Sequence, residues 1–368
     1  MKKLLTVFFF AAILPMAWSQ RIDCTQSLSQ AQDEFNAGHF FGLSSILQQC
    51  LESDGFSNEQ KVQAYRLLAQ AYLLTDDPIA AEDSYLKLLI ADPEYLADEI
   101  KDPVDIYFLS KKFTATPRFT PTLFRLGGNL SFVHTTTRIN TNSSSSVSYK
   151  QGLKVGYQIG SGIDYNVNDH LAVSTEVNLA LKGYSRTENG LFGSDEKSVT
   201  ETQYWLDVPF YVKYAAPLGK IRPFGYAGFA LNYLISSKAQ MVATNNEGIS
   251  QNPTEGPNEN LLYKRNRLNY SVLLGGGIRY KIGRDFLMVD LRYMAGLSNV
   301  VNKDYNYYDA KSGYTMANTI GKYQYIGDYF RLDNLSLSVG YVKPLYAPRK
   351  IKKARTKSAM KKISKQDN

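Results

Sequence analysis

The sequence predicts an α+β protein of several domains, in which an N-terminal α-helical domain precedes an eight-stranded antiparallel transmembrane β-barrel. Apolar residues have helical spacing up to about residue 113, and from about residue 118 they alternate with polar residues. The composition is also unusual, with 27 tyrosines, 18 phenylalanines and 26 glycines among 368 residues. We expect a signal peptide over 1–19, the helical domain over 20–113, the barrel over 118–346 and a basic tail over 347–368.

The first residues have the pattern of a secretory signal. Lys2 and Lys3 precede the mostly apolar run Leu4–Met16, and Ala17–Ser19 supplies the small residues of a cleavage site. A retained membrane anchor is the alternative, but the run is shorter than the roughly 20 residues of a spanning helix. We therefore expect a mature chain that starts at Gln20 in the periplasm.

The net charge of +8 comes from the two ends of the chain. Of the 42 basic and 34 acidic residues, nine Lys or Arg and one Asp follow Pro348, and Lys2 and Lys3 lie in the signal. This leaves 31 basic and 33 acidic residues between them. The charge therefore does not predict nucleic-acid binding.

The tail has too little apolar surface to fold alone. It is either simply solvated or an electrostatic tether to an acidic periplasmic partner, to peptidoglycan or to anionic lipid. In the second case the partner-binding residues are Lys352, Lys353, Arg355, Lys357, Lys361 and Lys362.

The two cysteines, Cys24 and Cys50, both lie in the helical domain. An even pair in an oxidising compartment predicts a disulfide, whereas two lone cysteines make a poor metal site. The bond would close a loop of about 25 residues and add about 3 kcal/mol of stability.

Residues 65–93 resemble one tetratricopeptide repeat (TPR), a 34-residue helix-turn-helix unit. The matching positions are Tyr65, Leu68, Ala69, Tyr72, Ala81, Tyr85, Leu88 and Pro93. A looser unit precedes it over 31–51, and a third helix is expected over 103–112. The resemblance implies either a concave partner-binding groove that carries Arg66, Gln70 and Leu73, or a structural cap without a groove.

The barrel prediction depends on long alternating segments of about 12 to 17 residues, well beyond the usual strand of five or six. The eight expected strands are 121–137, 152–167, 171–187, 200–216, 221–243, 267–283, 286–302 and 329–345. Tight turns at 168–169, 217–219 and 283–285 alternate with long loops at 138–151, 188–199, 244–266 and 303–328. Outer-membrane barrels have short periplasmic turns and long outer loops, so both ends of this barrel are expected in the periplasm.

The polar face of these strands carries charges of both signs. They are Lys154, Asp164, Glu176, Lys182, Asp207, Lys213, Arg279, Asp290 and Arg292. Eight strands leave an interior that side chains fill, so we expect salt bridges there, with glycines making room for large neighbours, rather than a water channel.

Three segments carry a family resemblance: 204–214 followed by 221–228, and 289–293 with 296–299. They resemble the Bacteroidetes outer-membrane β-barrel domain family, which includes a barrel associated with type IX secretion. The resemblance covers about 120–346 and implies an outer-membrane barrel. The helical domain and the tail lie outside the family pattern.

No catalytic or cofactor motif is recognisable. His39, His134 and His170 are scattered without a neighbouring acid–nucleophile set, and no phosphate loop or zinc spacing occurs. We therefore expect no enzyme activity, no cofactor and no metal.

Two functions remain, with narrow-channel transport a third. The first is a non-catalytic scaffold whose helical domain and tail bind periplasmic or outer-membrane proteins of an envelope complex, with type IX secretion or gliding as the candidate machine. The second is a surface receptor or adhesin that binds protein or glycan through the tyrosine-rich loop 303–328. The loop residues expected to bind are Tyr305, Tyr307, Tyr308 and Tyr314.

Overall fold

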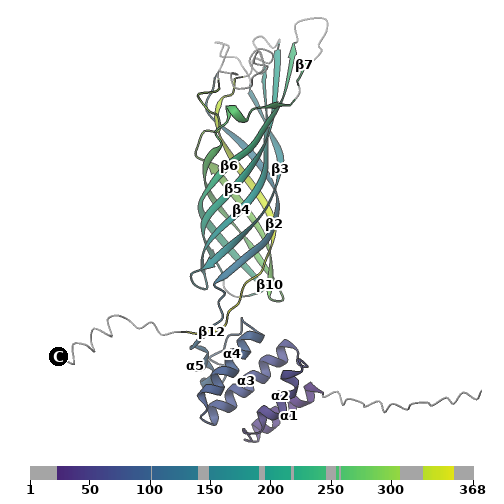
Figure 1. Cartoon of the computed structure of the whole chain (residues 1–368), viewed down its shortest axis with the longest axis vertical. Coiled ribbons are helices and arrows are strands. Elements are labelled where there is room, and N and C mark those ends of the chain that lie inside the picture. Colours follow the sequence, from purple (N-terminus) through teal and green to yellow (C-terminus); the bar gives the residue numbers. More distant parts are fainter. Residues whose placement is uncertain are drawn as a thin grey trace, which may run out of the picture. The chain divides into compact units, whose positions relative to one another are not determined.

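A computed structural model describes residues 23–100, 102–139, 149–189, 195–216, 219–245, 254–256, 258–306 and 326–351 (Figure 1). The chain divides into two compact units. The helical unit combines Met1–Ala115 with Pro348–Asn368, and the barrel unit is Thr116–Ala347. The predicted signal peptide, 1–19, lies outside the described residues.

In its described residues the helical unit contains five helices. They are α1 (Cys24–Asn36), α2 (Leu43–Glu52), α3 (Asn58–Leu74), α4 (Pro78–Ala91) and α5 (Val104–Ser110). Local sequence explains where two of them begin. Ser57 and Gln60 form a reciprocal capping box at the start of α3, and Pro78 occupies the first turn of α4, where a missing N–H costs little.

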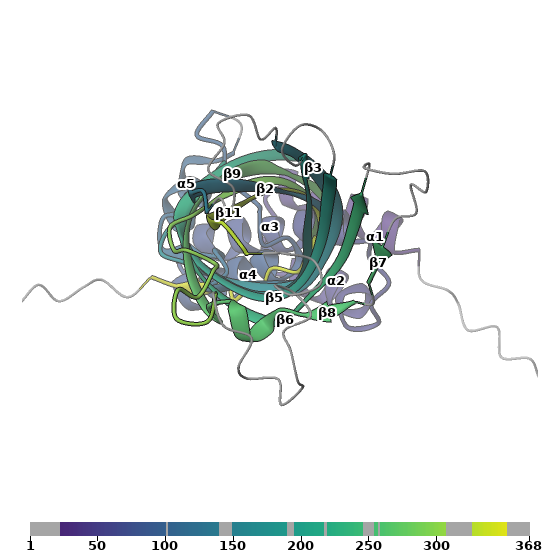
Figure 2. The ribbon, with the colours of Figure 1, turned by 90° about the horizontal axis from the view of Figure 1, so that it is seen from above.

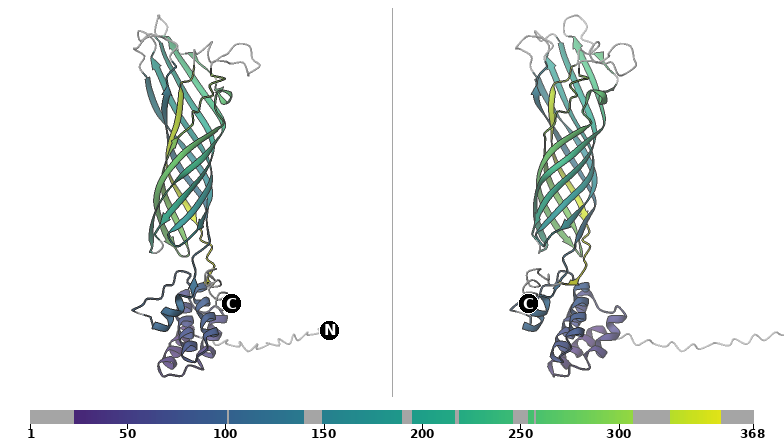
Figure 3. Two further views of the ribbon diagram at one scale, coloured as in Figure 1. Left: turned by 90° about the vertical axis from the view of Figure 1, so that its left-hand side faces the viewer. Right: turned by 60° about the vertical axis from the view of Figure 1, so that its left-hand side comes forward.

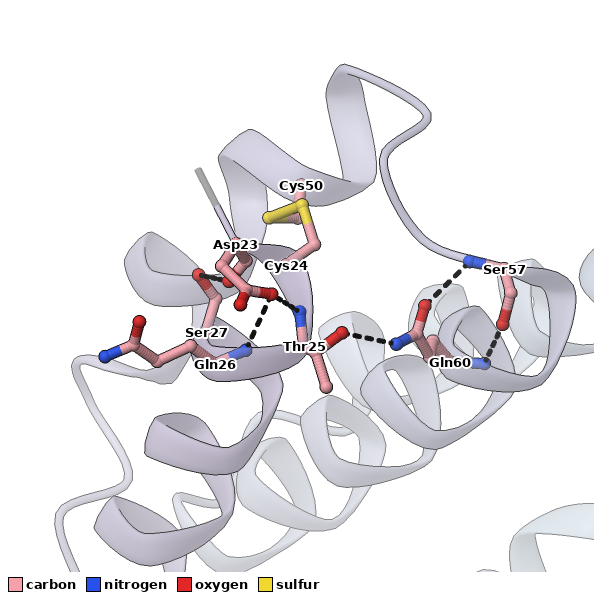
Figure 4. The surroundings of a disulfide bond; sticks show 8 residues. All are labelled: Asp23, Cys24, Thr25, Gln26, Ser27, Cys50, Ser57 and Gln60. Carbon is pink, nitrogen blue, oxygen red and sulfur yellow. Dashed lines mark hydrogen bonds between the residues drawn. A yellow bond between two sulfur atoms is a disulfide. The ribbon is translucent and has the colours of Figure 1, made fainter. Parts of the chain in front are cut away.

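A disulfide joins Cys24 at the start of α1 to Cys50 in α2, which confirms the predicted pair (Figure 4). The Asp23 carboxylate accepts hydrogen bonds from the amides of Thr25 and Gln26 and so caps α1. The side-chain amide of Gln60 in α3 donates to the Thr25 hydroxyl. The first turn of α1 is thus fixed to both α2 and α3.

Two apolar clusters form the core of the helical unit. One joins α1, α2 and α3, and the other joins α3, α4 and α5. Ala69 and Ala81 are fully buried, which lets α3 and α4 approach closely, and Tyr85 fills the space beside them. The helix-turn-helix of α3 and α4 agrees with the expected repeat, while its assignment as a TPR stays a prediction.

The chain that follows the barrel returns to the helical unit. Strand β1 (Phe113–Thr114) pairs antiparallel with β12 (Arg349–Lys350), and the amide of Ile351 donates to the Lys112 carbonyl at 2.7 Å. We call this pairing the clasp. The ammonium groups of Lys350 and Lys112 both contact the Glu82 carboxylate of α4. The hydrogen bond from Lys350 is the largest influence that holds the pKa of Glu82 below its ordinary value.

Replacing Glu82 by glutamine is expected to loosen the clasp. The lowered pKa keeps Glu82 ionised at neutral pH, so the ion pair is present there and is lost only as the pH falls below about 4.5 through that pKa. Tryptic cleavage after Lys350 should become about two- to fivefold faster in Glu82→Gln at pH 7.5. Cleavage after Lys357 in the same chain is the internal control and should not change; equal rates after Lys350 would contradict a role for Glu82.

Eight long strands make up the barrel unit in the ranges that the structure describes. They are β2 (Phe119–Thr137), β3 (Tyr149–Asn166), β4 (Leu171–Asn189), β5 (Asp195–Ala215), β6 (Ile221–Asn245), β9 (Leu268–Ile282), β10 (Asp285–Gly296) and β11 (Tyr329–Val342). Each pairs antiparallel with its neighbour along the chain, β11 pairs with β2, and β5 pairs with both β4 and β6. The ladder therefore returns on itself, and the view in Figure 2 shows the strands as a ring. The predicted eight-stranded antiparallel barrel is confirmed, with strands tilted as Figure 3 shows.

Three connections differ from the prediction. Strand β10 ends at Gly296 rather than near residue 302, because the side chain of Asn299 accepts hydrogen bonds from the amides of Val301 and Phe330 and so turns the chain out of the ladder. Only 190–194 separate β4 from β5, so most of the expected loop 188–199 is strand. The expected loop 244–266 contains the short strands β7 (Thr254–Glu255) and β8 (Glu259–Asn260) and a 3-10 turn at Leu262–Lys264.

The barrel presents apolar side chains on its outer face, while polar and charged side chains line its interior together with buried apolar ones such as Phe286 and Met288. Along β10, Leu287, Val289 and Leu291 are exposed, whereas Asp290 and Arg292 at alternate positions are buried. A band of exposed apolar residues on a closed antiparallel ladder is typical of a barrel in lipid. Among the described helices, none combines the length and apolar character needed to cross a membrane.

Candidate functional site

A channel or binding site in the barrel would lie in its interior, where a buried carboxylate, Glu176, is heavily paired. Glu176 on β4 accepts from Arg125 of β2 and from Arg292 of β10, each at 2.8 Å. The hydroxyl of Tyr211 donates to the same carboxylate. All four side chains are nearly inaccessible, so this cluster crosses the barrel and fills it.

A second carboxylate extends this cluster. Asp290 on β10 accepts from Arg125 and from the hydroxyl of Tyr226, and the Arg292 guanidinium donates to the Tyr226 hydroxyl at 2.9 Å. Two arginines and two carboxylates, all nearly inaccessible, therefore balance one another's charge. Charges in such an interior need this pairing, because an unpaired charge there is costly.

Further ion pairs lie on either side of this cluster. Asp164 accepts from Lys213 at 2.8 Å and from Arg279 at 2.6 Å. Lys182 pairs with Asp207 at 2.8 Å. Eight of the nine predicted interior charges thus form ion pairs, as expected, and the ninth, Lys154, donates to the Thr202 hydroxyl.

Glycines make room for these side chains. A Cβ at Gly275 would overlap the ring of Tyr226, and one at Gly277 would crowd Phe224. The glycines of the Gly275–Gly277 run therefore make room for neighbouring aromatic side chains, as predicted from the sequence, and they lie within strand β9 rather than in a phosphate-binding loop.

A small cavity remains beside Lys182, Trp205 and Asn269. Its volume is about 20 Å³, which is space for about one water molecule. That is too small for an organic ligand.

The long-loop end of the barrel, where the connections after β2, β4, β6 and β10 lie, is closed by a group that the sequence did not predict. Arg265 follows the 3-10 turn and inserts a fully buried guanidinium that donates twice to Glu201 of β5, at 2.9 and 2.6 Å. Ser237, Gln203 and Tyr184 also donate to Glu201. The Arg265 guanidinium lies 5.6 Å from the ring centre of Phe330. Polar runs such as 244–266 give no periodic signal for such an insertion.

The filled interior predicts an electrically silent protein. Purified barrel added to planar lipid bilayers should give no ion conductance steps, because the side chains of Arg125, Glu176 and Arg292 occupy the cross-section. A porin measured in the same bilayers is the positive control. Reproducible conductance from the folded protein would contradict a sealed interior.

The residues of the predicted helical groove are largely used within the unit. Arg66 pairs with Asp102 at 3.0 Å, in the segment that precedes α5. Leu73 packs against the core cluster of α3, α4 and α5, and Gln70 is half-buried. Partner binding through these three residues stays a prediction.

A different surface of the helical unit is open. Val104 and Phe108 lie one turn apart on α5 and are each 64% exposed, with Asp105 beside them. In the turn before the helix, Ile100 is 94% exposed and Glu99 is exposed too. We call these five residues the α5 face. The sequence reasoning missed it, because exposure of apolar residues on a short helix cannot be told from burial by spacing alone.

Most of the predicted binding residues of the last long loop and of the tail lie outside the described residues. Of the loop tyrosines, Tyr305 is described, whereas Tyr307, Tyr308 and Tyr314 lie outside the described residues. The same is true of all six predicted binding residues of the tail, which are Lys352, Lys353, Arg355, Lys357, Lys361 and Lys362.

The three histidines lie apart from one another. His39 pairs with Glu34 at 2.7 Å, His170 stacks on Tyr214, and His134 is exposed on β2. Over the described ranges, no three His, Cys, Asp or Glu side chains are grouped as metal ligands would be.

Comparison with known proteins concerns the barrel. Residues 116–302, just over half of the chain, match the model of a family described as the outer membrane protein beta-barrel domain. Among solved structures, OprG from Pseudomonas aeruginosa is similar at 10% identity and a TM-score of 0.34, over 64% of this chain and 99% of that chain. Ail, the attachment invasion locus protein of Yersinia pestis, is similar at 12% identity and a TM-score of 0.26, over 61% and 99%. Neisserial surface protein A is similar at 10% identity and a TM-score of 0.25, over 61% and 99%. None of the curated proteins matches the chain.

Proposed function

The chain belongs to the outer membrane protein β-barrel domain family, and from that premise we propose that it is a non-catalytic scaffold of the outer membrane. The barrel anchors the protein in lipid. The helical unit and the basic tail face the periplasm and bind partner proteins of an envelope complex. The resemblance to a barrel associated with type IX secretion makes secretion or gliding the machine to test first.

The observation that carries this proposal is that the barrel has a filled interior, whereas the helical unit in the same chain has an exposed apolar surface. The paired charges around Glu176 leave no path for a solute, which argues against transport. Exposed clusters of apolar residues mark protein or membrane contacts more often than bare surface does. The α5 face has this character on the described surface of the helical unit.

The orientation follows from loop lengths. The turns after β3 and β9 are tight, whereas the connections after β2, β6 and β10 are long. Outer-membrane barrels keep short turns in the periplasm. Both chain ends leave the barrel on the short-turn side, so the helical unit and the tail belong in the periplasm.

The test is affinity purification from gently solubilised outer membranes, with mass spectrometry of the proteins that accompany the barrel. The wild-type chain is compared with a Val104→Ser, Phe108→Ser variant and with Phe41→Ser, which removes an exposed aromatic residue elsewhere on the helical unit. We expect a stoichiometric set of envelope proteins that is lost in the double variant and kept in Phe41→Ser. An unchanged set in all three, or a solitary barrel, would refute binding through this face.

A second candidate is surface binding at the long-loop end. Strands β5 and β6 have 21 and 25 residues, about twice the 9 to 11 that cross a bilayer. Beyond the lipid they contribute Val199, Ala239 and Met241 to an apolar cluster that also contains Leu261, which follows β8. Removal of 307–325 should abolish adhesion to host or glycan surfaces if this end is the binding site, and should leave it intact otherwise.

A further inference from the structure

The α5 face has a candidate occupant in the same chain. We infer that the basic tail, residues 352–368, folds back and binds the α5 face of its own helical unit. The inference rests on the exit point of the tail, on its length, on charge and on its apolar spacing.

The clasp delivers the tail beside α5. The amide of Ile351, the last described residue, donates to the carbonyl of Lys112, which lies four residues after Phe108. Lys112 comes two residues after Ser110, where α5 ends, and two residues span at most about 7 Å. The tail therefore begins close to the end of α5.

The tail is long enough to cover the face. Its 17 residues would extend over about 55 Å as a strand and about 25 Å as a helix. The seven residues of α5 rise only about 10 Å. Either conformation of the tail therefore reaches past the helix to Ile100.

The charges of the two surfaces are complementary. Residues 352–368 carry seven Lys or Arg and one Asp. On the α5 face, Glu99 and Asp105 are exposed, and neither forms an ion pair with another residue in the part of the chain that the structure describes. Two exposed carboxylates at the edge of the apolar surface could therefore pair with lysines of the tail.

The tail also has apolar residues to set against the face. Thr356, Ala359, Met360 and Ile363 follow one another at spacings of three, one and three residues, which places them on one side of a helix. The other positions of that segment are Lys357, Ser358, Lys361 and Lys362. Such a helix would lay Met360 and Ile363 on Val104 and Phe108 and leave its lysines near Glu99 and Asp105.

The tail then acts as a removable cover. A partner that binds the α5 face must displace the tail, and a partner that binds the tail uncovers the face. This regulatory consequence rests on the proposed function, whereas the contact within the chain does not. The two can be tested apart.

The test is photo-cross-linking in the purified full-length protein, without partners. p-Benzoylphenylalanine replaces Phe108, and the cross-linked peptides are identified by mass spectrometry after irradiation. We expect a link from position 108 to residues 352–368. Irradiation of a mixture of isotopically heavy and light protein shows whether the link lies within one chain.

Two variants test the chemistry of the contact. Glu99→Gln with Asp105→Asn should lower the cross-link yield about two- to fivefold, and raising NaCl from 0.05 to 0.5 M should act similarly. The photo-reactive residue at Phe41, which is 89% exposed and remote from α5 in sequence, is the control and should give no tail link. Absence of the link from position 108, a link only between copies, or a link only to lipid would overturn the inference. None of these results depends on the outcome of the affinity purification.

Discussion

A Glu176→Leu barrel is expected to lose about 3–5 kcal/mol of unfolding free energy, because the change leaves buried arginines without their shared carboxylate. Arg125 and Arg292 both donate to Glu176, and both are about 2% exposed. Asp290 can balance only one of them. The Tyr211 hydroxyl loses its acceptor as well.

The measurement is urea unfolding of the refolded barrel in detergent or liposomes, followed by tryptophan fluorescence. The chain has two tryptophans, and a protein expressed from Gln20 onward, without Trp18, keeps only Trp205, which is buried in the barrel. Glu196→Leu, at an exposed position on β5, is the matched control and should change stability by less than about 0.5 kcal/mol. Equal midpoints for the wild type and Glu176→Leu would mean that water, rather than protein, solvates the interior charges.

Loss of the disulfide is expected to have the second large effect, confined to the helical unit. Opening the loop between Cys24 and Cys50 should cost about 3 kcal/mol on the loop-entropy model. For a unit of about 100 residues, each kcal/mol shifts the melting temperature by about 4–8 °C, so the helical melt should fall by about 12–24 °C.

Thermal melts followed by far-ultraviolet circular dichroism, with and without dithiothreitol, measure this effect. Reduction is preferable to Cys50→Ala alone, since Cys50 is fully buried and its removal also leaves a cavity. The Trp205 transition of the barrel should not move under the same conditions. If dithiothreitol does not change the melting temperature of the helical unit, the packing of α1 on α2 and α3 stabilises the unit without the disulfide.

The sequence predicted the barrel well because lipid imposes a simple rule on each strand. Alternation in 152–167 identifies β3 without knowledge of any other strand, and the interior charges follow from the same period. What alternation cannot give is the partner of each charge. That Arg292 meets Glu176 depends on the tilt and register of several strands between β4 and β10.

The elements that escaped prediction are short or lack a period. The two residues of β12, Arg349 and Lys350, read as part of a charged tail, and only the presence of β1 makes them a strand. Arg265 stands in a polar run, and its burial depends on Glu201, which lies 64 residues away. In the helical unit the short helix α5 was expected, but which of its sides stays open depends on how α3 and α4 pack against it.

The clasp has a consequence for the order of biogenesis. Residues 24–115 leave the ribosome long before Arg349 is synthesised, yet the strand partner of β1 is β12, at Arg349–Lys350. Contacts of such high sequence separation form late in folding. The helical unit therefore lacks the β1–β12 pairing until the strands between its two parts, and then β12, have been synthesised. A chain that ends before β12 cannot form the clasp. The presence of the clasp therefore indicates that the chain was synthesised past the last strand of the barrel.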